Sequence, residues 1–235
     1  ELQINYTLAG FHFSAFAIGM LLSGLFGERI HWRWGYLRTL WISAFGMAAG
    51  VLVFIAGRSV WVTIPGAFLM GLLGSSIVSA VNASLSQKYK EQSAIALTEV
   101  NVVSSFMGMC SPLLVGFFAA TFLGWRAALV AALLGLLLLA LVYLRPATQP
   151  VARVQLPAQK KFQLPLQYWL YWLVMYMVVA VEFCMIYWGS DFLNVVTGLA
   201  REAAVLSLSL FLGGMLTGRF LGSRLLQRTT AAALF

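Results

Sequence analysis

The chain has 235 residues, of which 61% are hydrophobic and 9% are charged, with a mean hydropathy of +0.89 and a formal net charge of +8. A soluble domain carries about 25% charged residues, so this composition excludes an ordinary water-soluble protein. The positive charge does not indicate nucleic-acid binding, because the sequence has no basic helix face and no basic patch interleaved with aromatic residues.

Seven apolar stretches follow one another along the chain, and each predicts a membrane-spanning helix. A helix needs about 20 apolar residues to cross a hydrocarbon core of about 30 Å. The stretches cover residues 7–27, 39–57, 61–85, 95–122, 126–144, 167–190 and 203–218. The predicted fold class is therefore an all-α polytopic membrane protein.

The basic residues between and after these stretches alternate from gap to gap. Twelve of the fifteen Lys and Arg residues fall in every other gap, beginning with the gap after residue 27, and the other three fall in the remaining gaps. Lys and Arg gather in the cytoplasmic loops of membrane proteins. The pattern predicts a multi-pass protein of the cell membrane, with residues 1–6 outside and the basic gaps in the cytoplasm.

The longest gap, residues 145–166, holds four of the six prolines and predicts a cytoplasmic linker. It separates residues 1–144, a predicted N-terminal helical half, from residues 167–235, the predicted start of a C-terminal half. The chain begins at Glu1 without a basic leader before a first span that starts outside, and residues 229–235 resemble the opening of another span. We therefore expect an incomplete bundle that lacks a helix before residue 7.

The loop after the first span combines glycines with acidic and basic residues: Gly24, Glu28, Arg29, Gly35 and Arg38. It resembles the loop between the second and third helices of the major facilitator superfamily, whose pattern runs G-x-x-x-D-R-x-G-R-R. Gly24, Glu28 and Arg29 match in place, whereas Gly35 and Arg38 are displaced by about four residues. The resemblance implies a cytoplasmic gate formed by these charged residues. The alternative is an ordinary basic cytoplasmic loop.

A second segment of this kind closes the seventh stretch and contains Gly218, Arg219 and Arg224. It resembles the copy of the motif that follows the eighth helix of the same superfamily, which implies that these residues also belong to the cytoplasmic gate. Together the two segments imply an incomplete major-facilitator-type helical bundle. In that reading the chain covers helices two to eight, with the beginning of a ninth.

The sixth stretch contains Glu182, Trp188 and the pair Phe192-Leu193. This spacing is similar to a segment of the seventh helix of fucose-permease-like sugar transporters. Glu182 is also the one acid clearly well inside a stretch, where a carboxylate costs about 2.5 kcal/mol or more unless it has a partner or faces a cavity. We expect Glu182 to bind solute or couple protons. The alternative is a protonated residue that forms a structural hydrogen bond between helices.

Several other polar and aromatic residues are candidates for solute binding or proton coupling: Tyr187, Trp188, Asn82, Asn101, Glu99 and His12. A sugar site combines stacking aromatic rings with amides and a carboxylate, and this set contains all three. Four of them have an ordinary alternative. Trp and Tyr gather at membrane interfaces, and Glu99 and Asn101 could cap the cytoplasmic start of the fourth span.

Three classes of function compete. An enzyme is disfavoured, because the sequence has no H-E-x-x-H, no G-x-S-x-G and no cysteine-rich metal spacing, and we predict no catalytic residue, no cofactor and no metal site. A seven-helix receptor remains an alternative. The favoured function is a secondary active transporter that moves a small organic solute, a sugar or similar polar molecule, by alternating access, as a symporter with protons as the candidate coupling ion. A drug or metabolite efflux antiporter of the same superfamily is the alternative within that class, since Pro112 and Gly116 match part of an antiporter motif.

Overall fold

The computed structural model describes residues 5–144 and 165–226, and every regular element in these ranges is a helix. The predicted fold class is therefore confirmed. Residues 1–4, most of the predicted linker (145–164) and the predicted start of a further span after residue 226 lie outside the described residues.

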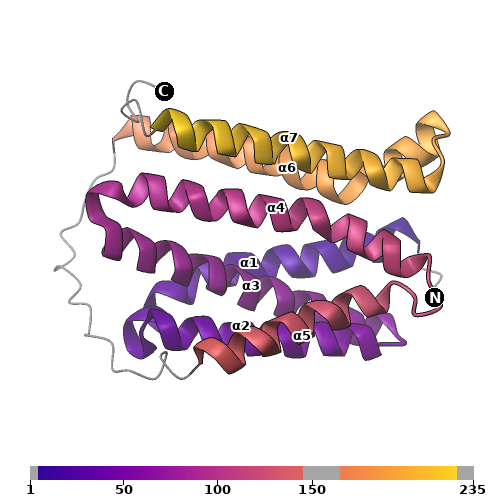
Figure 1. Cartoon of the computed structure of the whole chain (residues 1–235), viewed down its shortest axis with the longest axis horizontal. Helices are drawn as coiled ribbons and strands as arrows, with labels where there is room; N and C mark the ends of the chain where they lie inside the picture. Colours follow the sequence, from indigo (N-terminus) through magenta and orange to yellow (C-terminus); the bar gives the residue numbers. More distant parts are fainter. Residues whose placement is uncertain (1–4, 145–164, 227–235) are drawn as a thin grey trace. The chain divides into compact units, whose positions relative to one another are not determined.

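The seven α-helices follow the seven predicted spans in order (Figure 1). They are α1 (Tyr6–Trp34), α2 (Tyr36–Ala56), α3 (Val60–Tyr89), α4 (Ser93–Ala119), α5 (Arg126–Tyr143), α6 (Leu166–Thr197) and α7 (Arg201–Leu226), with a short 3-10 helix, η1 (Lys90–Gln92), between α3 and α4. In the described residues, five helical stretches are long and apolar enough to cross a membrane. One of them, Val60–Ala119, comprises α3, η1 and α4, and α7 is not among the five.

The chain divides into two compact units. Unit 1 comprises Glu1–Leu97 and Arg126–Val154, and unit 2 comprises Thr98–Trp125 and Gln155–Phe235. Among the described residues, unit 1 therefore holds α1, α2, α3 and α5, and unit 2 holds most of α4 together with α6 and α7. The two units are described separately below.

In unit 1, α1 and α3 pack so closely that their backbones touch. A methyl group added at Gly19 of α1 would overlap the backbone carbonyl of Phe68, and one added at Gly71 of α3 would overlap that of Phe16. Without water in the bilayer core, helices associate through such close contact of small residues. The contact depends on glycine at both positions, since any side chain would push the two helices apart.

Polar contacts on either side of this crossing show that α1 and α3 run parallel. His12 of α1 meets Thr63 near the start of α3, and Ser23 of α1 meets Ser76 farther along α3 through a buried 2.8 Å hydrogen bond. The C-terminal ends of α1 and α3 therefore lie at the same end of unit 1. The predicted charge alternation requires this arrangement, because it assigns the gaps after both helices to the same side of the membrane.

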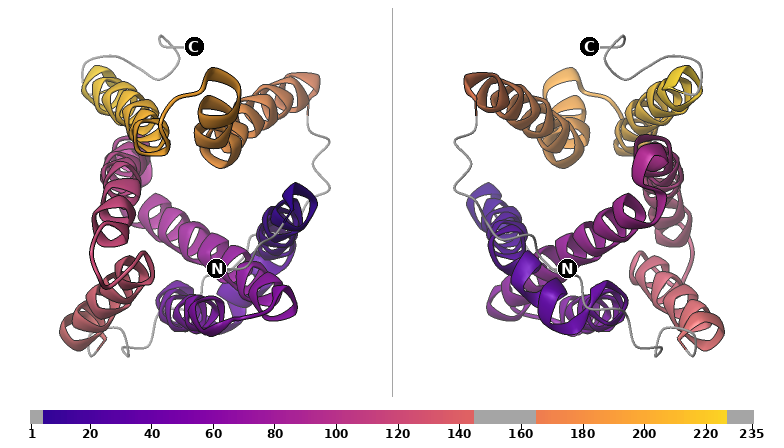
Figure 2. Two further views of the ribbon diagram at one scale, coloured as in Figure 1. Left: turned by 90° about the vertical axis from the view of Figure 1, so that its right-hand side faces the viewer. Right: turned by 90° about the vertical axis from the view of Figure 1, so that its left-hand side faces the viewer.

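In unit 2, α6 and α7 form a helical hairpin (Figure 2). Gly198 follows α6 with φ +71°, a left-handed conformation that glycine adopts without steric cost. The Asn194 side chain donates to the carbonyl of Leu199 at 2.8 Å and closes the turn, and α7 begins at Arg201. Residues at the middle of α6 are thereby brought opposite residues in the second half of α7.

Candidate functional site

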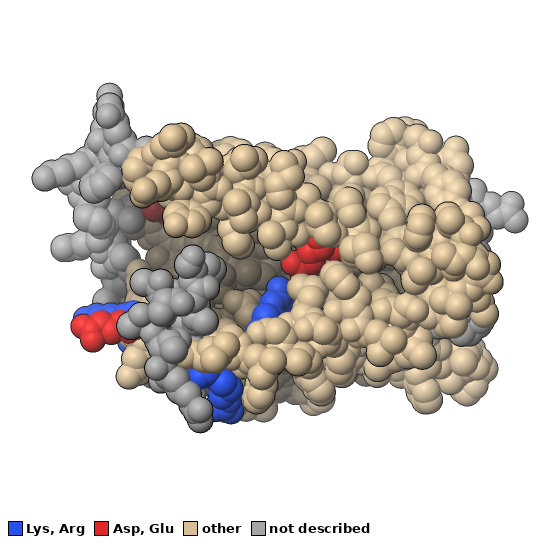
Figure 3. All heavy atoms as spheres, turned by 90° about the horizontal axis from the view of Figure 1, so that it is seen from above, with Lys and Arg blue, Asp and Glu red and all other residues tan. Residues whose placement is uncertain are grey.

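An ion pair joins the two helices of this hairpin. Glu182 lies at the middle of α6 (Leu166–Thr197), because 16 residues of the helix precede it and 15 follow it. Its Oε1 lies 3.7 Å from Nη2 of Arg219 on α7. This separation is an ion pair rather than a hydrogen bond, because the two atoms are too far apart for a well-formed one. In the view of Figure 3, the Lys, Arg, Asp and Glu side chains form a few separate patches among the other residues.

A serine of α4 holds the other side of the arginine. Ser105 is buried, and its hydroxyl donates to the carbonyl of Asn101 at 2.7 Å. The remaining lone pairs of the oxygen face Arg219, whose Nη1 donates to it. Helices α4, α6 and α7 of unit 2 therefore converge on one guanidinium group. The side chains of Arg219 and Glu182 are 36% and 26% exposed, so both remain accessible from the space beside them.

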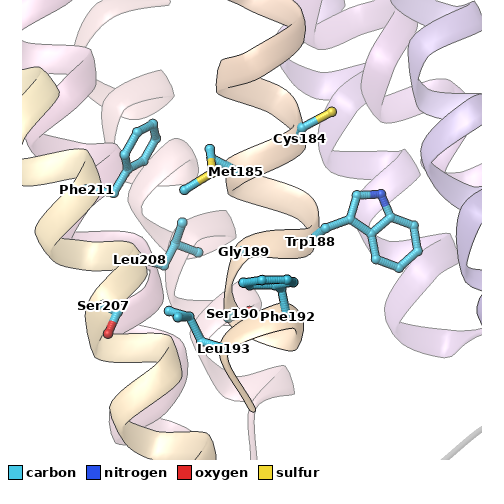
Figure 4. Close-up of a pocket in the computed structure, with 10 residues that line it drawn as sticks. All are labelled: Cys184, Met185, Trp188, Gly189, Ser190, Phe192, Leu193, Ser207, Leu208 and Phe211. Carbon is cyan, nitrogen blue, oxygen red and sulfur yellow. The ribbon is translucent and has the colours of Figure 1, made fainter. Parts of the chain in front are cut away.

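A cavity of about 420 Å³ lies between α6 and α7 (Figure 4). Its volume falls within the roughly 300–1,000 Å³ that small-molecule sites occupy. The lining is almost entirely apolar and comes from the second half of α6 and the first half of α7: Cys184, Met185, Trp188, Gly189, Ser190, Phe192, Leu193, Ser207, Leu208 and Phe211. Such a surface suits the apolar part of a solute.

The ion pair lies on the same helix faces as this cavity. Residues three, seven and eleven positions apart lie on one side of an α-helix, so Glu182 shares a face of α6 with Met185, Gly189 and Leu193. On α7, Arg219 follows the lining residue Leu208 by eleven residues and therefore shares a face of the helix with it. Glu182 lies one helical turn before the lining residue Met185, so the charged pair lies beyond the lining of the cavity rather than within it.

The two aromatic candidates of α6 lie differently. The rings of Tyr187 and Trp188 meet edge to face, with centroids 4.8 Å apart. Trp188 extends from α6 on the side away from α7 in Figure 4, and it follows Glu182 by six residues, which places it about 120° around the helix. The structure therefore does not bring Trp188 and Glu182 onto one face, although Trp188 contributes to the cavity wall.

The candidate His12 belongs to unit 1 and lies half-buried between α1 and α3. Its Nδ1 is 2.8 Å from the carbonyl of Leu8, which can only accept, so Nδ1 carries the hydrogen. In the neutral ring Nε2 is then an acceptor, and the Thr63 hydroxyl donates to it at 2.8 Å. This arrangement is typical of a polar contact that joins two helices.

The remaining candidates are divided between the two units. Asn82 is half-exposed on α3 in unit 1, while Glu99 and Asn101 are exposed on α4 in unit 2. The gate residues of the first motif, Glu28, Arg29 and Arg38, are exposed in unit 1, around the junction of α1 and α2. Gly218 and Arg224 lie on α7 near Arg219, and the Arg224 guanidinium lies 5.2 Å over the ring of Phe220.

Sequence reasoning missed two features of the site. Ser105 was not a candidate, although a hydroxyl four residues after Asn101 in an apolar helix could have drawn attention to that face of α4. Arg219 was assigned to the cytoplasmic gate, because it follows the last apolar stretch. The structure places it against the Glu182 carboxylate at the middle of α6, a contact that the sequence did not predict, and its role in the gate stays a prediction. The described residues contain no group of three or more His, Cys, Asp or Glu side chains placed to hold a metal ion.

Comparison with known proteins identifies the family. The model of the Major Facilitator Superfamily matches residues 1–235. Neither the curated proteins nor the solved structures yielded a match. The resemblance to that superfamily inferred from the two loop motifs is thus confirmed, whereas the more specific resemblance to fucose permeases is not. The chain is a multi-pass membrane protein that belongs to the major facilitator superfamily of transporters.

Proposed function

We propose that the protein is a secondary active transporter that moves a small organic solute across the cell membrane by alternating access. Residues 1–144 and 167–235 would belong to the two halves that move against each other, with residues 145–166 as the cytoplasmic linker. The observation that carries this proposal is the pair of Glu182 and Arg219 at the middle of α6, beside a cavity between α6 and α7. Charged groups at that depth are costly and typically mark the path of a solute or an ion, and transporters bind their solutes near the bilayer midplane.

Protons are the proposed coupling ion, because Glu182 can exist in two protonation states. Deprotonated, it pairs with Arg219. Protonated, it releases that pairing, and the guanidinium becomes available to another acceptor. The alternative is a purely structural ion pair that holds α6 against α7. Superfamily membership favours a transporter over the seven-helix receptor considered from the sequence.

The cavity bears on the solute class. A sugar presents hydroxyls on every side, and each needs a hydrogen-bonding partner when it is buried. The residues that line the cavity include only two serines among apolar and aromatic side chains. This lining favours an amphipathic solute over the sugar expected from the sequence, and it keeps drug or metabolite efflux as the second candidate function.

Transport by the intact protein in proteoliposomes tests the proposal. A panel of radiolabelled sugars, amphipathic acids and cationic drugs is offered with and without a pH gradient. We expect saturable uptake of one class, counterflow in preloaded vesicles, and accumulation driven by the gradient. Absence of uptake and counterflow for every class, in protein that is folded and correctly inserted, would contradict the proposed function.

A further inference from the structure

We infer that this site takes an amphipathic monocarboxylate, with its apolar body in the cavity between α6 and α7 and its carboxylate at Arg219 in place of the Glu182 carboxylate. The inference rests on the proposed transport function and assigns its solute class. It depends on three observations: the apolar lining, the position of Glu182 one helical turn before the lining residue Met185, and the 3.7 Å separation of Glu182 and Arg219.

The shape of the site separates an apolar part from a charged part. The cavity lining runs from Met185 to Leu193 on α6 and from Ser207 to Phe211 on α7. Figure 4 shows Met185 and Leu193 directed toward the side of α6 on which Leu208 and Phe211 of α7 lie. Glu182 lies three residues before Met185 on α6, and Arg219, which pairs with it, follows Phe211 by eight residues on α7. A ligand that fills this space therefore needs an apolar body and a polar group at one end.

Arg219 has donors to offer to that polar group. A guanidinium carries five N–H donors in a planar fork that matches a carboxylate. Nη1 donates to Ser105, whereas Nη2 lies 3.7 Å from Glu182 without a hydrogen bond between them. A third of the Arg219 side chain is exposed. An incoming carboxylate can thus gain charge-assisted hydrogen bonds that the Glu182 carboxylate does not make in this conformation.

The charge of the site specifies a single carboxylate. Glu182 and Arg219 together are neutral, and an unbalanced charge in the bilayer is costly. When the solute carboxylate takes its place beside Arg219, Glu182 takes up one proton from the water phase. The site then holds one cation, one anion and one neutral acid, and its net charge is unchanged. A bound dicarboxylate would give the site a net charge of −1. An uncharged solute would not displace Glu182 from Arg219.

In the described residues, Glu182 forms an ion pair with one charged side chain. From α7 that neighbour is Arg219, and Glu182 forms no second ion pair in the described part of the chain. The two titratable side chains of α4 are Glu99 and Cys110, which lie six residues before and five residues after Ser105, on other sides of that helix. On α6 the nearest titratable groups, Cys184 and Tyr187, are two and five residues beyond Glu182 and also point to other sides.

A matched series of probes tests the inference by equilibrium binding to the intact protein in nanodiscs. 3-Phenylpropionate is the monocarboxylate, 3-phenylpropanamide has the same shape without charge, phenylsuccinate is the dianion, and L-fucose is the sugar. We expect 3-phenylpropionate to bind at least about tenfold tighter than each of the others, the scale of a charge-assisted hydrogen bond. Its affinity should rise as the pH is lowered, as long as the probe itself stays ionised.

Three variants locate the effect. Arg219→Gln should abolish the preference for the acid over the amide, whereas Arg219→Lys should keep the preference at lower affinity, because it retains the cation without the planar fork. Glu182→Gln imitates the protonated carboxyl and should bind the acid equally well at every pH. Arg58→Gln removes a cation that lies outside the site, in unit 1, and is the control. Each variant is first checked for a single gel-filtration peak and an unchanged melting temperature.

Equal binding of the acid and the amide would overturn the inference and would indicate a neutral apolar occupant such as a lipid chain. Preferential binding of fucose or of the dianion would overturn it as well, and so would a preference for the acid that survives in a folded Arg219→Gln variant. None of these outcomes bears on transport itself. The proposed function fails separately, if the intact protein moves no solute in the uptake and counterflow assays.

Discussion

The imidazole Nε2 of His12 on α1 lies 2.8 Å from the hydroxyl of Thr63 on α3. The Thr63 hydroxyl also lies 3.3 Å and 3.4 Å from the carbonyls of Ser59 and Val60. It can therefore donate to a neutral His12, or donate to its own helix and accept from a protonated one. This contact makes His12 a polar link between two parallel helices.

The first prediction follows from that contact. Thr63→Val keeps the shape of the side chain but removes the hydroxyl, and the free energy of unfolding should fall by about 1 kcal/mol, the scale measured for hydrogen bonds between membrane helices. Thr63→Ser keeps the hydroxyl and is the matched control. Unfolding by SDS titration in mixed micelles provides the measurement. A Thr63→Val protein as stable as the wild type would show that the contact contributes nothing.

The close crossing of α1 and α3 leads to the second prediction. Gly71→Ala places a methyl group against the backbone carbonyl of Phe16, which cannot move aside without shifting α1. We expect a loss of about 1–3 kcal/mol, the usual cost of overpacking. Gly10→Ala, on α1, has nothing within 4 Å of the added methyl and should leave the stability unchanged or raise it by up to about 1 kcal/mol. If both variants unfolded at the same SDS concentration, the close packing would be contradicted.

The third prediction concerns orientation. Arg58 lies between α2 and α3, in a gap with a single basic residue, whereas Lys88 lies at the end of α3, in a basic gap. In a background without native cysteines, Arg58→Cys should react with an impermeant maleimide added outside intact cells. Lys88→Cys should react only after the membrane is made permeable. The reverse pattern would invert the topology.

The fourth prediction concerns the gate residues at the end of α1. Glu28 and Arg29 are exposed, and the proposed role is to bias the inward-closed conformation by pairing across helix ends. Glu28→Gln and Arg29→Gln should change the fraction of protein open to the cytoplasm severalfold, because small differences in free energy shift a two-state population. Cytoplasmic accessibility and transport rate are measured together, with Arg58→Gln, between α2 and α3, as the control. If neither variant changed the accessibility or the transport rate, the proposed gate role would be contradicted, and these charges would serve only to orient the protein in the membrane.

The helices could be predicted from the sequence because each depends on one local property. A run of apolar residues of sufficient length must form a helix in a bilayer, where every backbone group needs an internal partner. All seven predicted spans correspond to helices, although α1, α6 and α7 extend seven or eight residues beyond the apolar runs at their C-terminal ends. These extensions carry charged residues, which hydropathy alone assigns to loops.

Local properties of the sequence do not predict the central contact of the site, the pairing of Glu182 with Arg219. Glu182 could be singled out because an acid inside an apolar run is unusual. Arg219 could not be assigned to it, since its position just after an apolar run is also that of a basic loop residue. The pairing depends on the hairpin at Gly198, which sets α7 opposite α6, and on a side chain long enough to reach back along its helix. The contact between Ser105 and Arg219 depends on how α4 packs beside α7, which the local sequence does not indicate.

The central claim, that Glu182 couples protons to solute movement through its pairing with Arg219, is tested most directly by pH-driven accumulation in proteoliposomes that contain the intact Glu182→Gln protein. Gln keeps the size and much of the hydrogen bonding of Glu but cannot release a proton. We predict that the variant inserts normally, still exchanges solute across the membrane, and no longer accumulates it against a gradient when the outside is acidified. Accumulation equal to that of the wild type, with unchanged solute affinity, would contradict the account and leave Glu182 as a structural partner of Arg219.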